Sequence, residues 1–317
     1  MNLKIWTFDL KLAHRWTVAS GVESGGKTVS PEIFVRLDSP DGTVGHGEAA
    51  PPERYGETPQ SVLKFLNRVK AAKLSFADLD ASMHYLESLA PGHRSAKAAL
   101  NLALLDGAAR HAGKPVYDHL GLGFTEQRHV TSFSIGIDKP DVIRQKVEAA
   151  ADFPVLKLKV GGPDDRENLA ALRAVAPDKW IRVDANEAWT TKEEALKQIE
   201  WLAGDGHVQF IEQPMPAATL PADLRWLKVH SPLPIFADES FHTDHDVPLC
   251  QECFHGVNAK LVKTGGITGA LHALQVARHA GLQTMIGCMI ESSLSISAAA
   301  HLAELADYLD LDGNLLI

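Results

Sequence analysis

Eight short apolar segments alternate with amphipathic helical segments over the last two thirds of the chain, and this alternation limits the possible folds more than any other feature. Apolar strands separated by helices are typical of parallel β/α units, in which each helix crosses one face of the sheet. The expected helices include 193–202 and 269–280. The expected strands are residues 130–137, 155–160, 180–186, 208–214, 234–240, 257–262, 284–291 and 308–313.

Eight consecutive β/α units favour a closed barrel. The alternative is a doubly wound open sheet, which normally carries a glycine-rich phosphate loop of the form G-x-G-x-x-G after its first strand. Nothing in this sequence resembles that loop. We therefore predict an α/β fold whose catalytic part, residues 126–317, is a modified TIM barrel with eight strands and seven helices between them, (β/α)7β.

The first third of the chain has a different pattern. Alternating segments at 2–12, 30–38 and 43–50, separated by Gly-Gly and Asp-Gly turns, predict a small antiparallel sheet. Three helical stretches follow, and each is bounded by a capping residue, a proline or a glycine. They are expected at 59–72, 77–89 and 95–112. We predict an α+β domain over residues 1–125, joined to the barrel by the glycine-containing segment 120–124.

Composition excludes several classes of protein. The chain has 317 residues, 31 Lys and Arg, 40 Asp and Glu, and a formal net charge of −9, which argues against binding nucleic acid or an anionic membrane by bulk charge. No apolar stretch is long enough to span a membrane, and the first residues do not resemble a signal peptide. Three cysteines cannot form a disulfide framework, so a cytoplasmic location is expected. A homo-oligomer is compatible with all of this.

Charged residues occupy the ends of the expected strands, where a buried barrel should be apolar. Asp184, Glu212 and Asp238 recur once per β/α unit, so they should lie on three adjacent strands and point into the barrel mouth, where active sites form. Three converging carboxylates repel one another unless a cation neutralises them. An all-oxygen ligand set favours Mg²⁺ over Mn²⁺ or Ca²⁺. Alternatively, one or two of these acids cap a helix or pair with an arginine.

Lysines flank the carboxylates on both sides. Lys157 and Lys159 should share one face of their strand, and Lys260 lies four strands further round, on the opposite wall. Two neighbouring ammonium groups disfavour each other's charge, so at least one pKa in the 157/159 pair should be lowered, as a proton-transferring lysine requires. Simple pairing with nearby acids is a reasonable alternative for Lys157 and Lys263.

Six segments carry a resemblance to a known family: LKLKVGG, VDANEAW, IEQP, ADES, NAKLVKTGGI and GCMIESS. In this order and spacing the chain resembles the muconate-lactonizing subgroup of the enolase superfamily along its whole length. The resemblance implies an N-terminal capping domain and Mg²⁺ bound by Asp184, Glu212 and Asp238. It also implies an acid/base pair, Lys159 and Lys260, and removal of a proton α to a carboxylate through an enediolate that Mg²⁺ stabilises.

The last strand narrows the resemblance to the dipeptide epimerases. Asp310 and Asp312 match their D-x-D motif, which holds the α-ammonium of a dipeptide, and two carboxylates on one strand face would suit such a cation. The expected partner is thus a small dipeptide. The segment Cys288, Met289 and Ile290 matches the stretch whose backbone meets the substrate, and Glu291 should lie behind it.

Substrate specificity should depend on two capping-domain loops, near 14–26 and 51–58. The L-Ala-D/L-Glu epimerases have an arginine in the first loop that binds the substrate's glutamate carboxylate, and aligning this loop puts Ser20 near its place. Arg15 could replace it only if the loop is drawn differently. With Glu23, Glu53 and Glu57 nearby, acidic dipeptides should be disfavoured, which leaves neutral, hydrophobic or cationic ones.

Other functions fit the sequence less well. An o-succinylbenzoate synthase or N-succinylamino acid racemase would act on acylated substrates, for which the D-x-D pair has no purpose. A muconate cycloisomerase would bind a dicarboxylate that the same pair repels. A metal-binding barrel without turnover would need no lysines on both walls.

Overall fold

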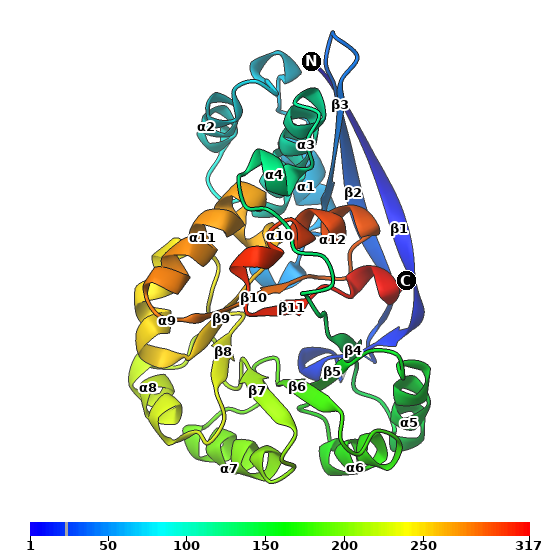
Figure 1. Cartoon of the computed structure of the whole chain (residues 1–317), viewed down its shortest axis with the longest axis vertical. Helices are drawn as coiled ribbons and strands as arrows, with labels where there is room; N and C mark the ends of the chain where they lie inside the picture. Colours follow the sequence, from blue (N-terminus) through cyan, green and yellow to red (C-terminus); the bar gives the residue numbers. More distant parts are fainter. Residues whose placement is uncertain (23–24) are drawn as a thin grey trace.

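An eight-stranded parallel sheet forms the larger part of the molecule (Figure 1), as seen in a computed structural model that describes residues 1–22 and 25–317. Its strands pair in chain order. A bridge between Thr131 and Leu309, next to the first and last strands, nearly closes the barrel, which confirms the predicted fold. The strands are β4 Phe133–Ile135, β5 Val155–Lys159, β6 Trp180–Asp184, β7 Val208–Glu212, β8 Ile235–Ala237, β9 Gly256–Ala259, β10 Gln283–Gly287 and β11 Tyr308–Asp310.

Helices surround this sheet because each has one apolar stripe to bury against the strands. Helix α7, for example, buries Ala195, Ile199 and Leu202 on one face, and the Thr191 hydroxyl caps its start by accepting from Glu194 N at 3.2 Å. The barrel helices are α5 Pro140–Ala149, α6 Asp165–Val175, α7 Lys192–Ala203, α8 Pro221–His230, α9 Val247–Cys253, α10 Leu261–Thr264, α11 Ile267–His279 and α12 Ser293–Ala300.

The interior of the barrel below its mouth is filled by side chains. Phe210 stacks on Phe236 with ring centroids 4.3 Å apart, and Tyr308 meets both rings edge-on. The Arg182 guanidinium lies 5.0 Å from the Tyr308 ring centroid and donates to the backbone oxygen of Leu309. The barrel is therefore a packed core that contains Arg182, and its buried carboxylates and lysines collect at one end.

The N-terminal part is an antiparallel sheet covered by helices, as predicted. Its strands are β1 Asn2–Trp16, β2 Lys27–Asp38 and β3 Val44–Ala49, and its helices are α1 Pro59–Leu66, α2 Leu79–Leu89, α3 Arg94–His111 and α4 Val116–His119. Helix α1 begins as predicted with a Thr58 cap, but it ends at Leu66, six residues before the expected end. The chain then turns, and Lys70 N donates to the Tyr85 hydroxyl of α2, which a continuing helix would not permit.

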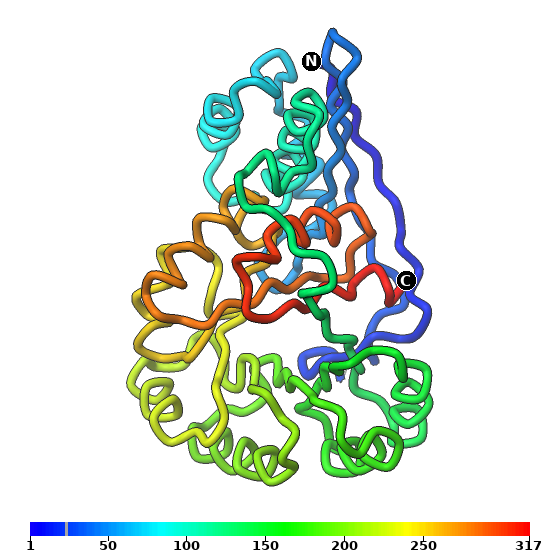
Figure 2. Tube along the Cα trace, viewed as in Figure 1, coloured from blue at the N-terminus to red at the C-terminus, as the bar shows by residue number. Residues whose placement is uncertain are grey.

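Helix α3 lies between the small sheet and the barrel (Figures 1 and 2). It is rich in Ala and Leu and is buried on nearly all sides, as expected for a helix with apolar residues around its circumference. It approaches β3 so closely that a Cβ atom on Gly45 or Gly47 would collide with the carbonyl oxygens of Ala103 or Ala99. These glycines fix the sheet against α3.

The two parts of the molecule also meet near the chain ends. Glu48 of β3 accepts hydrogen bonds from Ser292 N and Ser295 N at the start of α12, at 2.7 and 3.1 Å. Ala13 N of β1 donates to Leu316 O at 2.9 Å, so the C-terminus lies beside β1 (Figure 1). Across the described residues, no helix is both long and apolar enough to cross a membrane.

Candidate active site

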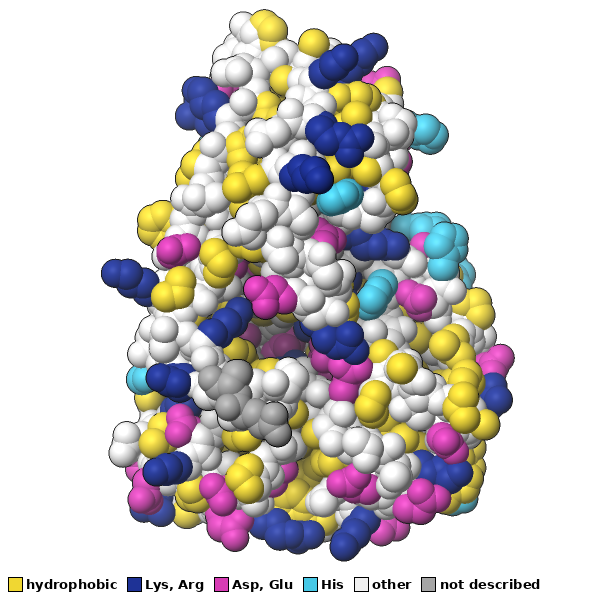
Figure 3. All heavy atoms as spheres, turned by 180° about the vertical axis from the view of Figure 1, so that it is seen from behind, with side chains coloured by type: hydrophobic (Ala, Val, Ile, Leu, Met, Phe, Trp, Pro, Cys, Tyr) yellow, Lys and Arg dark blue, Asp and Glu magenta, His cyan; other side chains and the backbone are white. Residues whose placement is uncertain are grey.

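A cavity of about 460 Å³ lies where the N-terminal part meets the barrel mouth, and a hollow with acidic and basic side chains is visible there in Figure 3. Its walls come from both parts of the chain, because the loops after β1 and β3 cover the carboxyl ends of the barrel strands. From the barrel it is lined by Ser134, Lys157, Lys159, Asn186, Glu187, Asp238, Glu239, Lys260, Cys288, Met289, Ile290, Asp310, Asp312 and Leu316.

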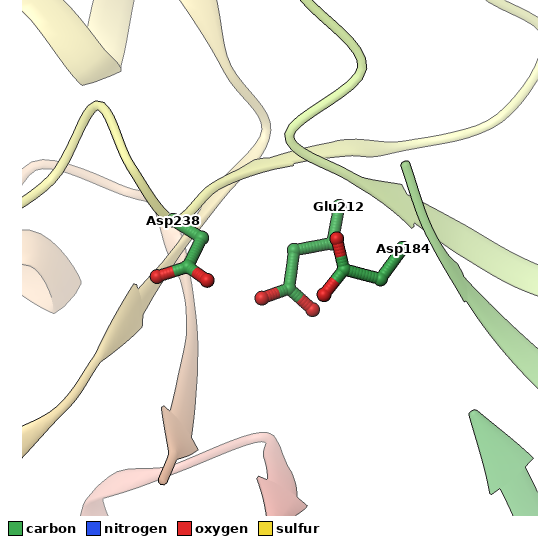
Figure 4. Close-up of side chains that lie close together, drawn as sticks. All are labelled: Asp184, Glu212 and Asp238. Carbon is green, nitrogen blue, oxygen red and sulfur yellow. The ribbon is translucent and has the colours of Figure 1, made fainter. Parts of the chain in front are cut away.

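Three buried carboxylates converge beneath this cavity. Asp184 ends β6, Glu212 ends β7 and Asp238 directly follows β8, so parallel pairing brings all three to one end of the sheet. One oxygen of each lies within 4.8 Å of the others, and none is more than 1% exposed. Figure 4 shows them facing a common space. The predicted convergence is thus present in the structure.

The turns after these strands hold the carboxylates in place. Asn186 N donates to Asp184 Oδ1 at 2.9 Å, and Asn258 Nδ2 donates to Glu212 Oε1 at 2.7 Å. The Gln213 side chain accepts from Asp238 N at 2.9 Å, and its own backbone has a φ of 34°, a left-handed value uncommon outside glycine. Sequence analysis did not identify these three amides, which lie in or next to the quoted motifs.

The donor set fits a hard divalent cation. All three residues offer carboxylate oxygen, and Glu212 Oε2 is buried with the Lys157 ammonium as its contact, at 2.7 Å. Burial and the neighbouring Asp184 charge raise the pKa of Glu212 to about 7, as expected when carboxylates are crowded without enough positive charge. Burial opposes ionisation of Asp238 as well, but the Lys260 and Lys263 ammonium groups outweigh it and lower its pKa well below the usual value.

One wall of the site carries Lys157 and Lys159, both from β5 and both directed into the mouth, as their alternation predicted. Lys159 Nζ lies 2.6 Å from Asp184 Oδ2. Lys157 Nζ lies 3.0 Å from Asp184, 2.7 Å from Glu212 and 2.7 Å from Asp310. Burial alone would lower the pKa of Lys157, but these three carboxylates raise it well above its usual value. The lowering expected for at least one lysine of this pair therefore does not occur at Lys157, because its acidic neighbours outweigh its burial.

The opposite wall carries Lys260 and Lys263. Lys260 directly follows β9, four strands from β5, and its Nζ lies 2.7 Å from Asp238 Oδ2. Lys263 Nζ binds Asp238 Oδ1 at 2.6 Å and the backbone oxygens of Asp238 and Asn258, so it is fully engaged in supporting that strand end. Lys260 lines the cavity, whereas Lys263 does not.

Asp310 and Asp312 both line the cavity, but their surroundings differ. Asp310 accepts from the Ser132 hydroxyl and from Lys157, both at 2.7 Å, and its pKa is about 2 because these contacts outweigh its burial. Asp312 accepts from Ser134 N at 2.6 Å, and burial beside Asp310 raises its pKa to about 6. Within the described part of the chain Asp312 forms no ion pair, while Asp310 is paired with Lys157.

The other predicted residues lie in the wall of the cavity, behind it or turned away from it. Ser20, Cys288, Met289 and Ile290 line the cavity. Glu291 is buried behind them near Glu48, as expected. Arg15 donates to Gly25 O instead of facing the cavity.

Of the three acids expected near the distal end, Glu53 lines the cavity, but Glu57 accepts from Arg94 N at 2.7 Å and caps α3. Glu23 lies outside the described residues. Trp16, Arg54 and Tyr55, which belong to the two predicted loops, also line the cavity, and so does Lys27, which the sequence analysis did not identify.

Two family models match the chain. The model described as "Enolase C-terminal domain-like" matches residues 141–310, and the model described as "Mandelate racemase / muconate lactonizing enzyme, N-terminal domain" matches residues 12–121.

Named relatives cover the chain from end to end. An L-Ala-D/L-amino acid epimerase from Pedosphaera parvula is 66% identical over 316 residues, which is 100% of this chain and 91% of the relative. The substrate-liganded L-Ala-D/L-Glu epimerase from Bacillus subtilis superimposes with a TM-score of 0.91 at 29% identity, covering 100% of this chain and 90% of that one. A dipeptide epimerase from Enterococcus faecalis, complexed with Mg and L-Leu-L-Tyr, gives 0.90 at 31% identity, covering 98% and 89%.

Proposed function

Because the chain belongs to the mandelate racemase / muconate lactonizing enzyme family of the enolase superfamily, we propose that it is a Mg²⁺-dependent dipeptide epimerase. It inverts the α-carbon of the C-terminal residue of a dipeptide by a 1,1-proton transfer. The observation that carries this proposal is the arrangement of the mouth, in which a cluster of three carboxylates lies between lysines on opposite walls.

Asp184, Glu212 and Asp238 would hold the metal. A bound Mg²⁺ would supply positive charge next to the substrate carboxylate, which lowers the cost of removing the α-proton. The amides of Asn186 and Asn258 and the Gln213 side chain keep these carboxylates or their strand end in position. Their hydrogen bonds leave Glu212 Oε2 in contact with the Lys157 ammonium alone among the described residues.

Lys159 and Lys260 would carry the proton. They stand on opposite walls, so each reaches one face of a substrate held between them. One lysine removes the α-proton and the other returns a proton to the opposite face, which inverts the centre. Lys157 supports this pair through its contact with Asp184, to which Lys159 is also bound.

Asp310 and Asp312 would bind the substrate's α-ammonium, since both line the cavity and Asp312 forms no ion pair with any lysine that the structure describes. The backbone of Cys288, Met289 and Ile290 lines the cavity beside them. This requirement for a free ammonium distinguishes a dipeptide from the acylated amino acids that an N-succinylamino acid racemase would use.

The distal side chain of the preferred dipeptide should not be acidic. Ser20 lines the distal part of the cavity, and Arg15 is turned to Gly25. Lys27 adds a positive charge there, but Glu53 interacts with it electrostatically, so the pair offers no unopposed cation. A dipeptide library that ranked L-Ala-L-Glu first would overturn this expectation.

Isotope exchange tests the reaction directly. The protein is incubated with Mg²⁺ and a dipeptide mixture in D₂O, and proton NMR follows the α-protons. A dipeptide epimerase introduces deuterium into an otherwise unchanged dipeptide and forms its epimer. A succinylamino acid racemase would exchange only acylated substrates, and a binding protein would exchange none, so either result would contradict the proposal.

We also propose the division of labour between the two parts of the chain. Residues 1–125 would act as the capping domain, with specificity loops near 14–26 and 51–58, and residues 126–317 as the catalytic barrel. The separate family matches to 12–121 and 141–310 support this boundary. Three free thiols, Cys250, Cys253 and Cys288, favour a cytoplasmic location.

A further inference from the structure

A short capping-domain segment, Pro52–Glu57, crosses the barrel mouth. It contains a 3₁₀ turn over Glu53–Tyr55, closed by hydrogen bonds from Tyr55 N and Gly56 N to Pro52 O and Glu53 O, each 2.9 Å. Pro52, Glu53, Arg54 and Tyr55 line the cavity. This segment, named here the cover segment, is held to its surroundings by three side chains.

The first attachment is an ion pair between the two domains. Arg54 Nε donates to Glu187 Oε2 and Arg54 Nη2 donates to Glu187 Oε1, both at 2.8 Å, so the guanidinium and carboxylate make a parallel two-bond contact. Glu187 Oε1 also accepts from Ala217 N at 2.7 Å. The Arg54 side chain is 55% exposed, but that of Glu187 is only 15% exposed. The acceptor carboxylate is therefore held by the barrel backbone as well as by Arg54.

The turn that carries Glu187 has an energetically unfavourable backbone conformation. Asn186 and Glu187 have φ values of 42° and 68°, two successive left-handed residues of which neither is glycine. Glu187 N donates to Gln213 O at 2.9 Å, which ties the turn to the strand end of Glu212. The same turn begins at Asp184, two residues before Asn186. Arg54 thus binds a turn that is directly attached to the carboxylate cluster.

The second and third attachments flank the first. The Tyr55 ring packs edge-on against the His242 imidazole, with centroids 4.6 Å apart, in the loop that follows Asp238. Glu57 caps α3 within the capping domain through Arg94 N and Ser95 N. Two attachments therefore reach the barrel on either side of Glu212, and one anchors the segment to its own domain. Of the two barrel attachments, only the Arg54–Glu187 pair is ionic.

We propose that Arg54 and Glu187 form a latch that holds the cover segment closed over the bound substrate. The latch retains substrate and orders the cover segment, and it takes no part in proton transfer. Arg54 and Glu187 are accordingly positioning residues. This inference rests on the proposed function for its kinetic part only, because closure of the cover segment can be measured without any substrate.

A double-mutant cycle tests the latch. The variants are Arg54→Ala, Glu187→Asn and both together; asparagine tolerates the left-handed backbone at position 187. Each single variant should raise KM about three- to tenfold and leave kcat within about twofold, the range for a partly exposed charged pair. The double variant should match Glu187→Asn, because the Arg54 substitution then has no contact left to remove, whereas Glu187→Asn also loses the hydrogen bond from Ala217 N. Arg54→Lys, which keeps one charge but not the two-bond geometry, should fall between.

Hydrogen exchange measured by mass spectrometry provides the substrate-independent readout. Peptides covering residues 52–57 should exchange faster in both single variants and equally fast in the double variant. The matched control is Arg225→Ala, which removes another arginine–glutamate pair, to Glu252 at 2.6 Å between α8 and α9, away from the mouth. That control should change neither KM nor exchange at 52–57.

The possible results of these two experiments distinguish the latch from the proposed function. Unchanged exchange at 52–57 in Arg54→Ala overturns the latch, whether or not any dipeptide is turned over. If the KM of the double variant rises by the product of the two single increases, the latch is also overturned, since the two residues then act independently. A large loss of kcat at unchanged KM would instead place Arg54 in the chemistry. If no dipeptide reacts but exchange rises in the single variants without adding in the double, the latch stands and the proposed function fails.

Discussion

Among the described residues, two sets of three buried carboxylates have contrasting surroundings. At the barrel mouth Asp184, Glu212 and Asp238 lie among lysines, with Nζ–oxygen distances of 2.6 to 3.0 Å. At the seam between the domains Glu32, Glu48 and Glu291 are equally buried, at 1 to 2% exposure, but their hydrogen bonds come from serine hydroxyls and backbone amides. Both groups are buried, but within the described structure only the carboxylates of the mouth form ion pairs with lysines.

The difference shows in the pKa values. Burial raises the pKa of Glu32 to about 9 and that of Glu291 to about 8, with neighbouring glutamates adding to the effect in both cases. In the mouth, the same burial is overcome by lysines at Asp184 and Asp238, whose pKa values are lowered. In the seam, burial thus favours the neutral form of Glu32 and Glu291, whereas in the mouth lysines favour the charged form of Asp184 and Asp238, as binding a cation requires.

Asp238→Asn should have the largest effect, because it removes one of the charges that distinguish the mouth from the seam. We expect loss of at least about a thousandfold in kcat/KM, since a carboxylate–metal bond supports the reaction, while the fold is retained. Mg²⁺ titration by calorimetry and turnover after EDTA treatment measure the change. Asp223→Asn, on the outer helix α8, is the control. Normal turnover by Asp238→Asn after EDTA treatment would show the metal assignment to be wrong.

Lys159→Ala and Lys260→Ala should come next. Inversion needs a group on each wall, so each variant should lose epimerisation in both directions by about 10²- to 10⁴-fold. The remaining lysine can still remove and return the proton on its own face. Each variant should therefore exchange the α-proton of only one epimer for deuterium, with retained configuration, and the two variants should be complementary in proton NMR.

Lys157→Ala is the comparison for that experiment. Its loss should slow the reaction and shift the pH–rate profile without stereochemical bias. If both wall variants lose exchange from the same epimer, the two-wall assignment fails and Lys263 becomes the next lysine to test.

Asp312→Asn should have an intermediate effect confined to substrate binding. Its carboxylate lacks a lysine partner, and removing one charge-assisted contact to the ammonium should raise KM roughly 10- to 100-fold. Asp310→Asn should reduce kcat as well, because Asp310 also binds Lys157. Steady-state kinetics with a dipeptide and its N-acetylated form measure this. If the acetylated form is used equally well by the unaltered protein, the ammonium assignment is incorrect.

Glu32→Gln should have the smallest effect, and its sign tests the seam. The folded-state pKa of Glu32, about 9, exceeds its usual value, so its contribution to stability is present at low pH and is lost as pH rises towards 9. A glutamine mimics the protonated form, so the variant should melt on the order of 2 °C higher at pH 8 and nearly unchanged at pH 5. Glu126→Gln, on an exposed segment, should show neither change. A lower melting temperature at pH 8 would mean that Glu32 is ionised.

The strand repeat and the position of the charged residues could be predicted from sequence because both follow from periodicity. One β/α unit separates successive carboxylates, and alternation puts Lys157 and Lys159 on one face, as the structure has them. Their catalytic roles remain predictions.

Contacts between segments far apart in the chain could not be predicted. The pKa of Lys157 depends on Asp310, and the pairing of Arg54 with Glu187 spans 133 positions. Neither contact leaves a local pattern in the sequence. The end of α1 at Leu66 likewise depends on Tyr85, in another helix.

The aromatic floor of the barrel has a consequence for timing. Phe210, Phe236 and Tyr308 fill the interior at the far end of the barrel, and the cover segment lies across the mouth at the other end. Exchange of an abstracted proton with bulk solvent should therefore depend on how freely solvent enters at the mouth. The ratio of deuterium uptake to inversion in D₂O would then measure how often solvent exchanges with the closed site during one catalytic cycle.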